Sequence, residues 1–240
     1  MPGSKELFPI GFQPLADGTL RPKVVSHYLL EKMHLAGVRK VYFILRQGKW
    51  DIPTYFGDGA MLDMNLAYLM MRLPFGAPYT LNQAYPFVQN TLVALGFPDA
   101  LFQPEDAFVH LLARQAEIQA GIVLGLFPTN QPHTADMVEL AGEGRVRQIL
   151  IKPPQTDLRY TWMIAVWTPV FTQFMHEFLS QAAADAPEQR ELHVGRVVQA
   201  AVEHGLPVEA VLFPEGTCLD VGMPANLVNA IRNFTPFSAS

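Results

Sequence analysis

Short apolar runs alternate with segments of helical periodicity along most of the chain. The apolar positions of residues 24–36 recur every three to four residues, which predicts an amphipathic helix that ends at Gly37. Lys40–Leu45 follows directly and has the composition of a buried strand. Further strands are predicted at residues 65–70, 121–127, 160–167, 208–213 and 218–221, and further helices at 104–119, 169–184, 192–203 and 225–232. This order predicts an α/β protein with a mostly parallel sheet and one or two antiparallel excursions.

Two segments depart from this alternation. Residues 136–140 and 145–151 flank Gly142-Glu143-Gly144, which predicts an antiparallel hairpin. Residues 1–10 contain no predicted strand, although the helix and strand that follow form half of a βαβ unit whose first strand should precede the helix. There is no internal repeat, and the only candidate linker, residues 183–187, is short. We therefore predict a single domain over residues 1–240.

The stretch from Thr91 to Asp99 organises the rest of the chain. Its apolar residues, closed by Gly96 and Pro98, predict a buried central strand with Asp99 at its carboxyl end. In open α/β sheets, ligands bind beyond the carboxyl ends of the strands. A carboxylate there suits a hard cation that contacts phosphate oxygens. The alternative is an ordinary turn, since Pro-Asp is common turn chemistry.

Composition narrows the class of protein. The chain has 240 residues, 50% of them hydrophobic and 16% charged, which is typical of a globular protein with a substantial core. The net charge of −5 and the lack of a Lys/Arg run argue against a nucleic-acid partner. The single cysteine, Cys218, excludes an internal disulfide and fits a reducing compartment. No apolar stretch is long enough to cross a bilayer, and no signal-peptide pattern is visible, so we expect a cytoplasmic protein without a membrane partner.

Four other features carry candidate chemistry. Lys5 lies in a loop before a helix, where an ammonium group either neutralises phosphate or stays solvated. Gly76 permits close backbone approach and Gln83 offers an amide for a base edge, although an ordinary loop and helix start explain both. Lys152 follows a predicted strand, where phosphate binding and simple solvation fit equally well. Asp220 stands between apolar residues of a short strand, which favours a functional role.

Other catalytic signatures are missing from the sequence. There is no G-x-G-x-x-G, no G-x-x-x-x-G-K-[ST], no H-E-x-x-H and no G-x-S-x-G. The seven histidines are scattered, and none stands at metal-ligand spacing with the cysteine. A Rossmann dehydrogenase is therefore disfavoured despite the α/β pattern.

Taken in chain order, several segments resemble the sugar-phosphate nucleotidyltransferases, the family that includes the glucose-1-phosphate thymidylyltransferases. The N-terminal Lys5–Gly11 is similar to the family's P-K-x-L-x-P segment, and Glu31–Val41 to its first helix and following strand. Pro98–Phe102 lies where the family has Gly-Asp-Asn and an apolar pair. The remaining similar segments are Pro53–Gly59 (I-x-x-Y-F-G-D-G), Gly144–Val146 (G-x-V), Ile151–Pro153 (E-K-P) and Leu219–Pro224 (W-x-D-x-G-T-P).

This resemblance implies a fold and a reaction. The fold is the Rossmann-like, mostly parallel sheet of the nucleotide-diphospho-sugar transferases. The reaction joins an NTP, such as dTTP or UTP, to a sugar 1-phosphate: the phosphate oxygen attacks the α-phosphorus, pyrophosphate leaves, and an NDP-sugar forms. Such catalysis is mostly positioning and charge neutralisation. Mg²⁺ is the implied cofactor, with Asp99 and Asp220 as its ligands.

The resemblance also implies roles for the other candidates. Lys5, with Asp99 and Asp220, would belong to the catalytic set and lie along the triphosphate. Lys152 would hold the phosphate of the sugar, and Gly76 and Gln83 would line the base pocket. Whether the protein forms a homo-oligomer is left open by the sequence.

The departures from the family lead to a second expectation. The family opens with a strand and a G-x-G-T-R loop that grips the triphosphate, whereas this sequence begins at Met1, where the residue after that arginine would stand. We therefore expect an N-terminally truncated domain that lacks the first strand of the sheet. Ala100, Ile151 and Met163 also replace an asparagine, a glutamate and a glycine of the family. The alternative function is a non-catalytic relative that serves as a binding or regulatory domain.

Overall fold

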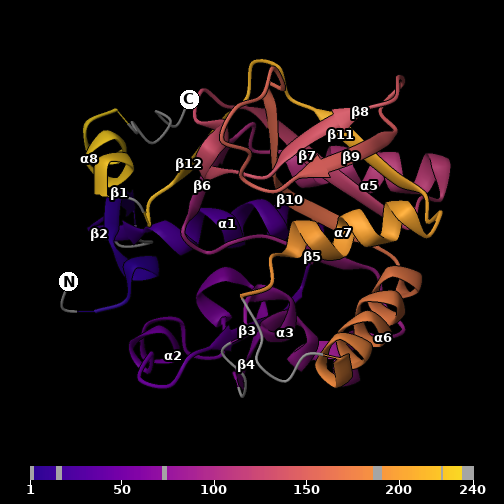
Figure 1. Cartoon of the computed structure of the whole chain (residues 1–240). Coiled ribbons are helices and arrows are strands. Elements are labelled where there is room, and N and C mark those ends of the chain that lie inside the picture. The colour runs from indigo at the N-terminus through magenta and orange to yellow at the C-terminus, as the bar shows by residue number, and fades with distance from the viewer. Residues whose placement is uncertain (1–2, 15–17, 72–74, 186–190, 223, 234–240) are drawn as a thin grey trace.

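The computed structural model describes residues 3–14, 18–71, 75–185, 191–222 and 224–233 (Figure 1). Helices and strands alternate through these residues, as the sequence pattern predicts. The strands are β1 (Pro9–Pro14), β2 (Leu20–Val24), β3 (Lys40–Leu45), β4 (Asn65–Met70), β5 (Val93–Leu95), β6 (Ala100–Gln103), β7 (Ile122–Pro128), β8 (Met137–Leu140), β9 (Val146–Leu150), β10 (Tyr160–Trp167), β11 (Val208–Leu212) and β12 (Thr217–Asp220). The α-helices are α1 (Val25–Leu35), α2 (Asp51–Phe56), α3 (Ala77–Leu81), α4 (Tyr85–Val88), α5 (Ala107–Ile118), α6 (Pro169–Asp185), α7 (Val194–Glu203) and α8 (Pro224–Asn233). Short 3₁₀ turns are η1 (Lys5–Leu7), η2 (Ala60–Leu62), η3 (Asn82–Ala84) and η4 (Pro132–Thr134).

The largest sheet is built around β10. Its strand order is β11-β7-β10-β8-β9, and β5 pairs with the last residues of β10. Alternate residues of β7 point to opposite faces, because side chains alternate along a strand. Leu124 and Leu126 join a core with α6 and α7, while Val123 and Phe127 join a second core with α1 and α5. The sheet is therefore covered by helices on both faces.

The strand pairing corrects the prediction of a mostly parallel sheet. Within the described residues, parallel pairing occurs between β3 and β4 and between β11 and β7, and the other pairs are antiparallel. The connections explain this difference, because parallel neighbours need a crossover of a dozen or more residues. The links that join β8 to β9 and β9 to β10 contain no helix and are shorter than that. The hairpin predicted on either side of Gly142-Glu143-Gly144 is confirmed by the β8–β9 pair.

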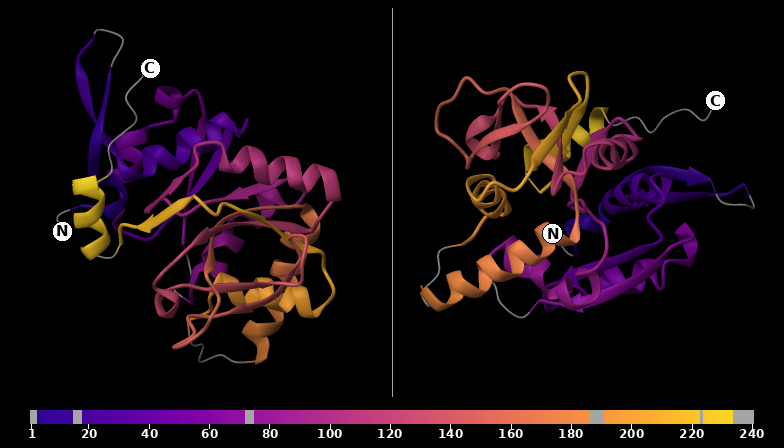
Figure 2. Two further views of the ribbon diagram at one scale, coloured as in Figure 1. Left: turned by 90° about the horizontal axis from the view of Figure 1, so that it is seen from above. Right: turned by 90° about the vertical axis from the view of Figure 1, so that its right-hand side faces the viewer.

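Two further predictions about strands are corrected. The N-terminal region, where no strand was predicted, contains the antiparallel pair β1–β2, which projects from the body of the molecule (Figure 2). Prolines at positions 9, 14 and 22 conceal these strands in the sequence, because proline is tolerated only at strand ends and edges. The stretch Thr91–Leu95 contributes only the short strand β5, whose one partner among the described residues is β10. Part of the candidate linker, residues 186 and 187, lies outside the described residues.

Candidate active site

Pairing between β6 and β12 brings the two candidate acids together. Asp220, the last residue of β12, lies opposite Ala100, the first residue of β6, and Asp99 immediately precedes Ala100. The backbone N–H of Val221 donates a hydrogen bond to the Asp99 carbonyl oxygen over 2.9 Å. Two carboxylates that are distant in the sequence therefore stand beside each other at the carboxyl ends of β5 and β12.

Lys5 reaches the same place from the N-terminal 3₁₀ turn η1. The turn is anchored by Ser4, whose backbone N–H and hydroxyl each donate to the Asp51 carboxylate over 2.7 Å. From this position the Lys5 ammonium forms an ion pair with Asp99 Oδ2. The side chain of Asp99 is only 18% exposed and that of Lys5 is 42% exposed, so the pair stands at the boundary between core and solvent.

Gly222 lies at the centre of these three side chains. A Cβ atom added to it would stand 2.6 Å from Lys5 Nζ, 2.8 Å from Asp220 Oδ1 and 3.3 Å from Asp99 Oδ2. The Gly222 N–H also donates to Asp220 Oδ1 over 2.7 Å and so holds that carboxylate in place. Only a residue without a side chain leaves the space between the three charged groups open.

The two acids of the cluster lie close together, and the nearby cations and hydrogen bonds only partly offset the rise in the pKa of Asp220. Burial, and then the nearby charge of Asp99, raise the pKa of Asp220, although the Gly222 N–H, Lys5 and Lys152 oppose the shift. For Lys5, burial alone would lower the pKa, but the hydrogen bond and charge of Asp99 outweigh it, so the pKa is raised. Lys5 therefore stays an ammonium ion. Burial and the neighbouring charge of Asp99 still make the ionised form of Asp220 less favourable.

Lys152 contributes positive charge near Asp220. It follows β9 and has a φ of 43°, a left-handed conformation that is uncommon for residues other than glycine. Its charge opposes the rise in the pKa of both Asp220 and Asp136, so it acts on both carboxylates. The strained backbone is consistent with a side chain that is held where a ligand binds.

Asp136 was missed by the sequence interpretation. It precedes β8, and burial raises its pKa while the charges of His193 and Lys152 and the Gly195 N–H oppose the shift. Its Oδ1 is buried and accepts no hydrogen bond from the residues that the structure describes. A Cβ on Gly195 would overlap its Oδ2, so glycine is needed at that position too. The available signal was an acid directly before the apolar residues 137 and 138, as at Asp220.

The two predicted base-pocket residues lie apart from this cluster. Gly76 precedes α3 with a φ of 108°, and a Cβ there would overlap the backbone of Leu192, so close approach of that segment explains the glycine. Its neighbourhood lines a cavity of about 990 Å³. The Gln83 amide donates to the Tyr79 carbonyl oxygen over 3.4 Å, and Gln83 is not among the residues that line the cavity. Their role in base binding stays a prediction.

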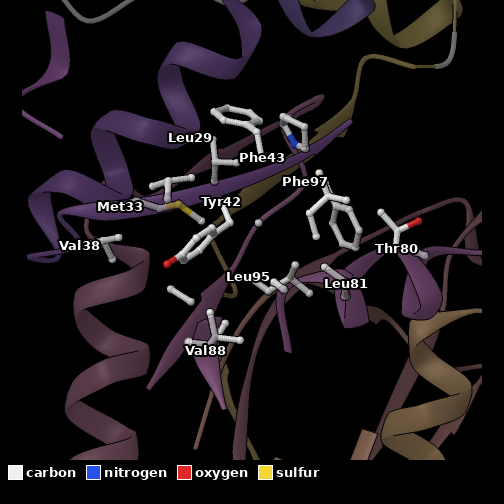
Figure 3. A pocket seen from close by; sticks show the side chains of 18 of the residues that line it. Leu29, Met33, Val38, Tyr42, Phe43, Thr80, Leu81, Val88, Leu95 and Phe97 are labelled. Atoms are coloured by element: carbon white, nitrogen blue, oxygen red, sulfur yellow. The ribbon is translucent and has the colours of Figure 1, made fainter. Parts of the chain in front are cut away.

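This cavity extends between β3 and β5, and its lining includes Lys5 and Asp99. Figure 3 shows that its walls are apolar side chains, among them Leu29 and Met33 from α1 and Leu81 and Val88 from the opposite side. The candidate site therefore combines a charged cluster at the ends of the strands with a deep apolar space behind it.

The acids fit a divalent cation of the Mg²⁺ type. Mg²⁺ is usually bound through one or two carboxylates together with water and substrate phosphates, rather than by a complete cage of protein ligands. Asp99 and Asp220 supply two such carboxylates, and the raised pKa of Asp220 shows negative charge that a cation would relieve. In the part of the chain that the structure describes, no group of three or more His, Cys, Asp or Glu side chains is arranged to hold a metal.

Comparison with known proteins first defines the class. A solved Bacillus anthracis structure described as a glucose-1-phosphate thymidylyltransferase with sucrose superimposes with a TM-score of 0.82, at 15% identity, over 99% of this chain and 89% of the other. The UDP-glucose pyrophosphorylase of Acinetobacter baumanii gives a TM-score of 0.76 at 14% identity, over 97% and 86%. Together with the mixed sheet and its two helical layers, these matches identify the fold as that of the nucleotide-diphospho-sugar transferases.

The sequence comparisons then identify the family. Residues 4–236 match the model of the nucleotidyl transferase family, and the chain belongs to this family. It is 25% identical over 212 residues to the glucose-1-phosphate thymidylyltransferase of Streptomyces antibioticus and 24% identical over 234 residues to that of Streptomyces griseus. These alignments cover 88% and 95% of this chain but only 57% and 59% of the two relatives, so the chain spans less than two thirds of their length.

Proposed function

We propose that this chain belongs to an enzyme that transfers a nucleotidyl group from an NTP to a sugar 1-phosphate. In this reaction a phosphate oxygen of the sugar attacks the α-phosphorus of the NTP. The bond between that phosphorus and the bridging oxygen breaks, and pyrophosphate leaves. The observation that carries the proposal is the convergence of Lys5, Asp99 and Asp220 around Gly222. The named relatives, which are thymidylyltransferases and pyrophosphorylases, support the reaction class.

The chain's own residues supply mainly charge and position. Lys5, held as a cation by Asp99, would lie against the triphosphate and neutralise it. Lys152 would hold the phosphate of the sugar, and its charge already acts on Asp220. Asp99 and Asp220 would hold Mg²⁺, which neutralises phosphate charge when it is bound. Fixing two anionic reactants in line by such groups is the main source of rate enhancement in phosphoryl and nucleotidyl transfer.

The proposal also covers the nucleotide base, the cellular location and the oligomeric state. Gly76 and Gln83 would contribute to the nucleotide-base pocket, with dTTP and UTP as the first nucleotides to test. We propose that the protein works in the cytoplasm, alone or as a homo-oligomer. A cytoplasmic location is supported by the single cysteine, and no helix in the described ranges is long and apolar enough to cross a membrane.

The proposal is tested by measuring pyrophosphate release and metal binding on the same variants. Pyrophosphate release is assayed with each NTP and a panel of sugar 1-phosphates, and Mn²⁺ binding is followed by electron paramagnetic resonance. Asp99→Asn and Asp220→Asn should each lower the rate by about 100-fold or more, because lost metal ligands cost several kcal/mol of charge stabilisation. The same substitutions should weaken Mn²⁺ binding.

Asp63→Asn is the matched control, because the Asp63 side chain is 91% exposed and lies outside the cluster. If all three variants keep the wild-type rate and Mn²⁺ affinity within a few-fold, the two-carboxylate site is wrong. The alternative function, a non-catalytic binding domain, predicts another pattern. In that case nucleotide and Mn²⁺ bind in a manner that depends on Asp99 and Asp220, but no NTP yields pyrophosphate.

A further inference from the structure

A second polar cluster lies where β8, β10 and the start of α7 meet. Thr161 of β10 is paired with Met137 of β8 in an antiparallel register. Trp162 and Asp136, the next residues on the two strands, are therefore cross-strand neighbours on one face of the sheet. The Thr161 hydroxyl also donates to the Asp136 carbonyl oxygen over 3.0 Å. The sheet thus holds the Asp136 carboxyl beside the Trp162 indole ring.

Both side chains have unmet hydrogen-bonding capacity. Asp136 Oδ1 and Trp162 Nε1 are buried and have no hydrogen-bond partner among the described residues. Trp162 as a whole is only 6% exposed, and its N–H lies near enough to Asp136 to oppose the rise in the pKa of that carboxyl. Buried polar groups of native proteins are nearly always satisfied by protein, water or ligand. An unpaired acceptor beside an unpaired donor therefore indicates a place for a group that both donates and accepts.

The surroundings of the Asp136 carboxyl are shaped by Gly195 and Ile151. A Cβ on Gly195, in the first turn of α7, would stand 2.4 Å from Asp136 Oδ2 and 2.8 Å from the Cδ1 atom of Ile151. The carboxyl and the Ile151 side chain are therefore neighbours. Ile151 replaces the glutamate of the family's E-K-P segment, and Asp136 supplies a carboxyl beside it from the paired strand.

Lys152 connects this cluster to the candidate active site. It directly follows Ile151, and its charge acts on both Asp136 and Asp220. Lys152 is exposed, whereas Asp136 is half-buried. Under the proposed function, Lys152 holds the phosphate of a sugar 1-phosphate. The hydroxyl groups of the attached sugar are then the parts of the ligand that can reach Asp136.

A sugar hydroxyl satisfies both unpaired groups at once. Its O–H donates to the Asp136 carboxylate, and its oxygen accepts from the Trp162 N–H. An ammonium group offers no acceptor to Trp162, and a methylene group offers neither partner. Sites that hydrogen-bond a hydroxyl discriminate strongly against analogues that lack it, because their buried polar groups are then left unpaired.

We propose that Asp136, together with Trp162, binds one hydroxyl group of the sugar 1-phosphate and thereby determines which sugars the site accepts. The inference rests on the proposed function, because it uses Lys152 as the phosphate-binding group. It also explains why the chain keeps a carboxyl in surroundings that disfavour its charge, since functional sites commonly retain such groups at a cost in stability.

The test compares matched sugars on matched variants by isothermal titration calorimetry. The 240-residue chain is titrated with glucose 1-phosphate and with its 2-, 3-, 4- and 6-deoxy analogues, in the presence of Mg²⁺ and α,β-methylene-UTP. Asp136→Ala should weaken the binding of glucose 1-phosphate by about tenfold or more. The same substitution should leave unchanged the binding of the one analogue that lacks the bound hydroxyl, because that contact is already missing. The other three analogues should lose affinity as glucose 1-phosphate does.

Two further variants make the result specific. Asp136→Asn keeps the shape of the side chain and one acceptor oxygen, so it should show the same selective pattern with a smaller loss. Circular dichroism checks that both Asp136 variants are folded. Asp157→Ala is the control, because Asp157 is exposed in the loop before β10, and this variant should bind all five ligands as the wild type does.

The inference is overturned if the Asp136 variants weaken all five ligands equally, since Asp136 would then only maintain the local fold. It is also overturned if neither variant changes binding or if glucose 1-phosphate does not bind. Pyrophosphate release with UTP on the same proteins separates this inference from the proposed function. Release by the wild type with an unselective effect of Asp136 overturns the specificity role alone. Selective binding without release supports that role and overturns nucleotidyl transfer.

Discussion

At the scale of single residues, two glycines leave the space in which charged side chains lie close together. Gly222 leaves room for Lys5, Asp99 and Asp220, and Gly195 leaves room for Asp136. In both places a Cβ would enter the position of a carboxylate oxygen. The carboxyl groups are thus brought close to other charges in partly buried surroundings, and burial raises the pKa of Asp136 and Asp220.

Asp136 gives a prediction for the pH dependence of stability. Its pKa in the folded state is raised, chiefly by burial, so the folded chain binds more protons than the unfolded chain between the two pKa values. The contribution of Asp136 to the free energy of unfolding is therefore most favourable below the unfolded pKa, about 3.9, and is lost as pH rises through the folded value. Asp136→Asn should accordingly stabilise the protein at pH 7.

Urea unfolding between pH 4 and pH 7 checks this expectation. The stability difference between Asp136→Asn and wild type should grow in favour of the variant as pH increases. Asp157→Asn, at an exposed position in the loop before β10, serves as the control and should show no such trend. A variant that is less stable than wild type at pH 7 would show that the hydrogen bond from Gly195 outweighs the burial of charge.

At the scale of elements, an ion pair joins α1 to the start of α5. Lys32 in α1 is 1% exposed, and its ammonium pairs with Glu105, which lies between β6 and α5 and is 44% exposed. Burial lowers the pKa of Lys32, and the hydrogen bond and charge of Glu105 oppose that shift. The Lys32 ammonium also lies 5.3 Å from the centre of the Phe102 ring. Water can therefore solvate Glu105 if Lys32 is removed, but it cannot solvate Lys32 if Glu105 is removed.

This difference predicts an asymmetry between two substitutions. Glu105→Gln leaves a buried ammonium unpaired and should lower the free energy of unfolding by about 1–3 kcal/mol, less than for a fully buried pair because Glu105 is partly solvated. Lys32→Met removes the buried charge and leaves a carboxylate that water can reach, so its cost should stay within about 1 kcal/mol. Urea unfolding of both variants measures the difference. Equal losses would show that Lys32 packing, not its charge, dominates.

At the scale of the whole molecule, an apolar cavity lies between the β3–β4 pair and the main sheet. The β3–β4 pair contacts the main sheet through α1 and the α3–α4 segment, without direct strand pairing among the described residues. Among the described residues, the two parts are therefore held together by side-chain packing and not by strand hydrogen bonds.

Most elements could be predicted from local pattern, because helices and buried strands carry their periodicity within a few residues. The spans of β3, β4 and β10 follow directly from apolar runs, and α1 and α5 follow from helical spacing. The pair β1–β2 could not be predicted in this way, since its prolines mimic a loop. The direction of strand pairing was also missed, because it depends on which strands become neighbours in space.

By itself, the sequence determined the α/β class and the family, and it singled out Lys5, Asp99, Asp220 and Lys152 as candidates, because these depend on residue types and their order along the chain. Only the tertiary structure decided that β6 pairs with β12 and so brings the two acids to Gly222, that the charge of Lys152 acts on Asp136, and that an apolar cavity lies between β3 and β5. The physical reason is that burial, charge proximity and strand pairing are properties of residues distant in sequence. No local pattern in the chain records them.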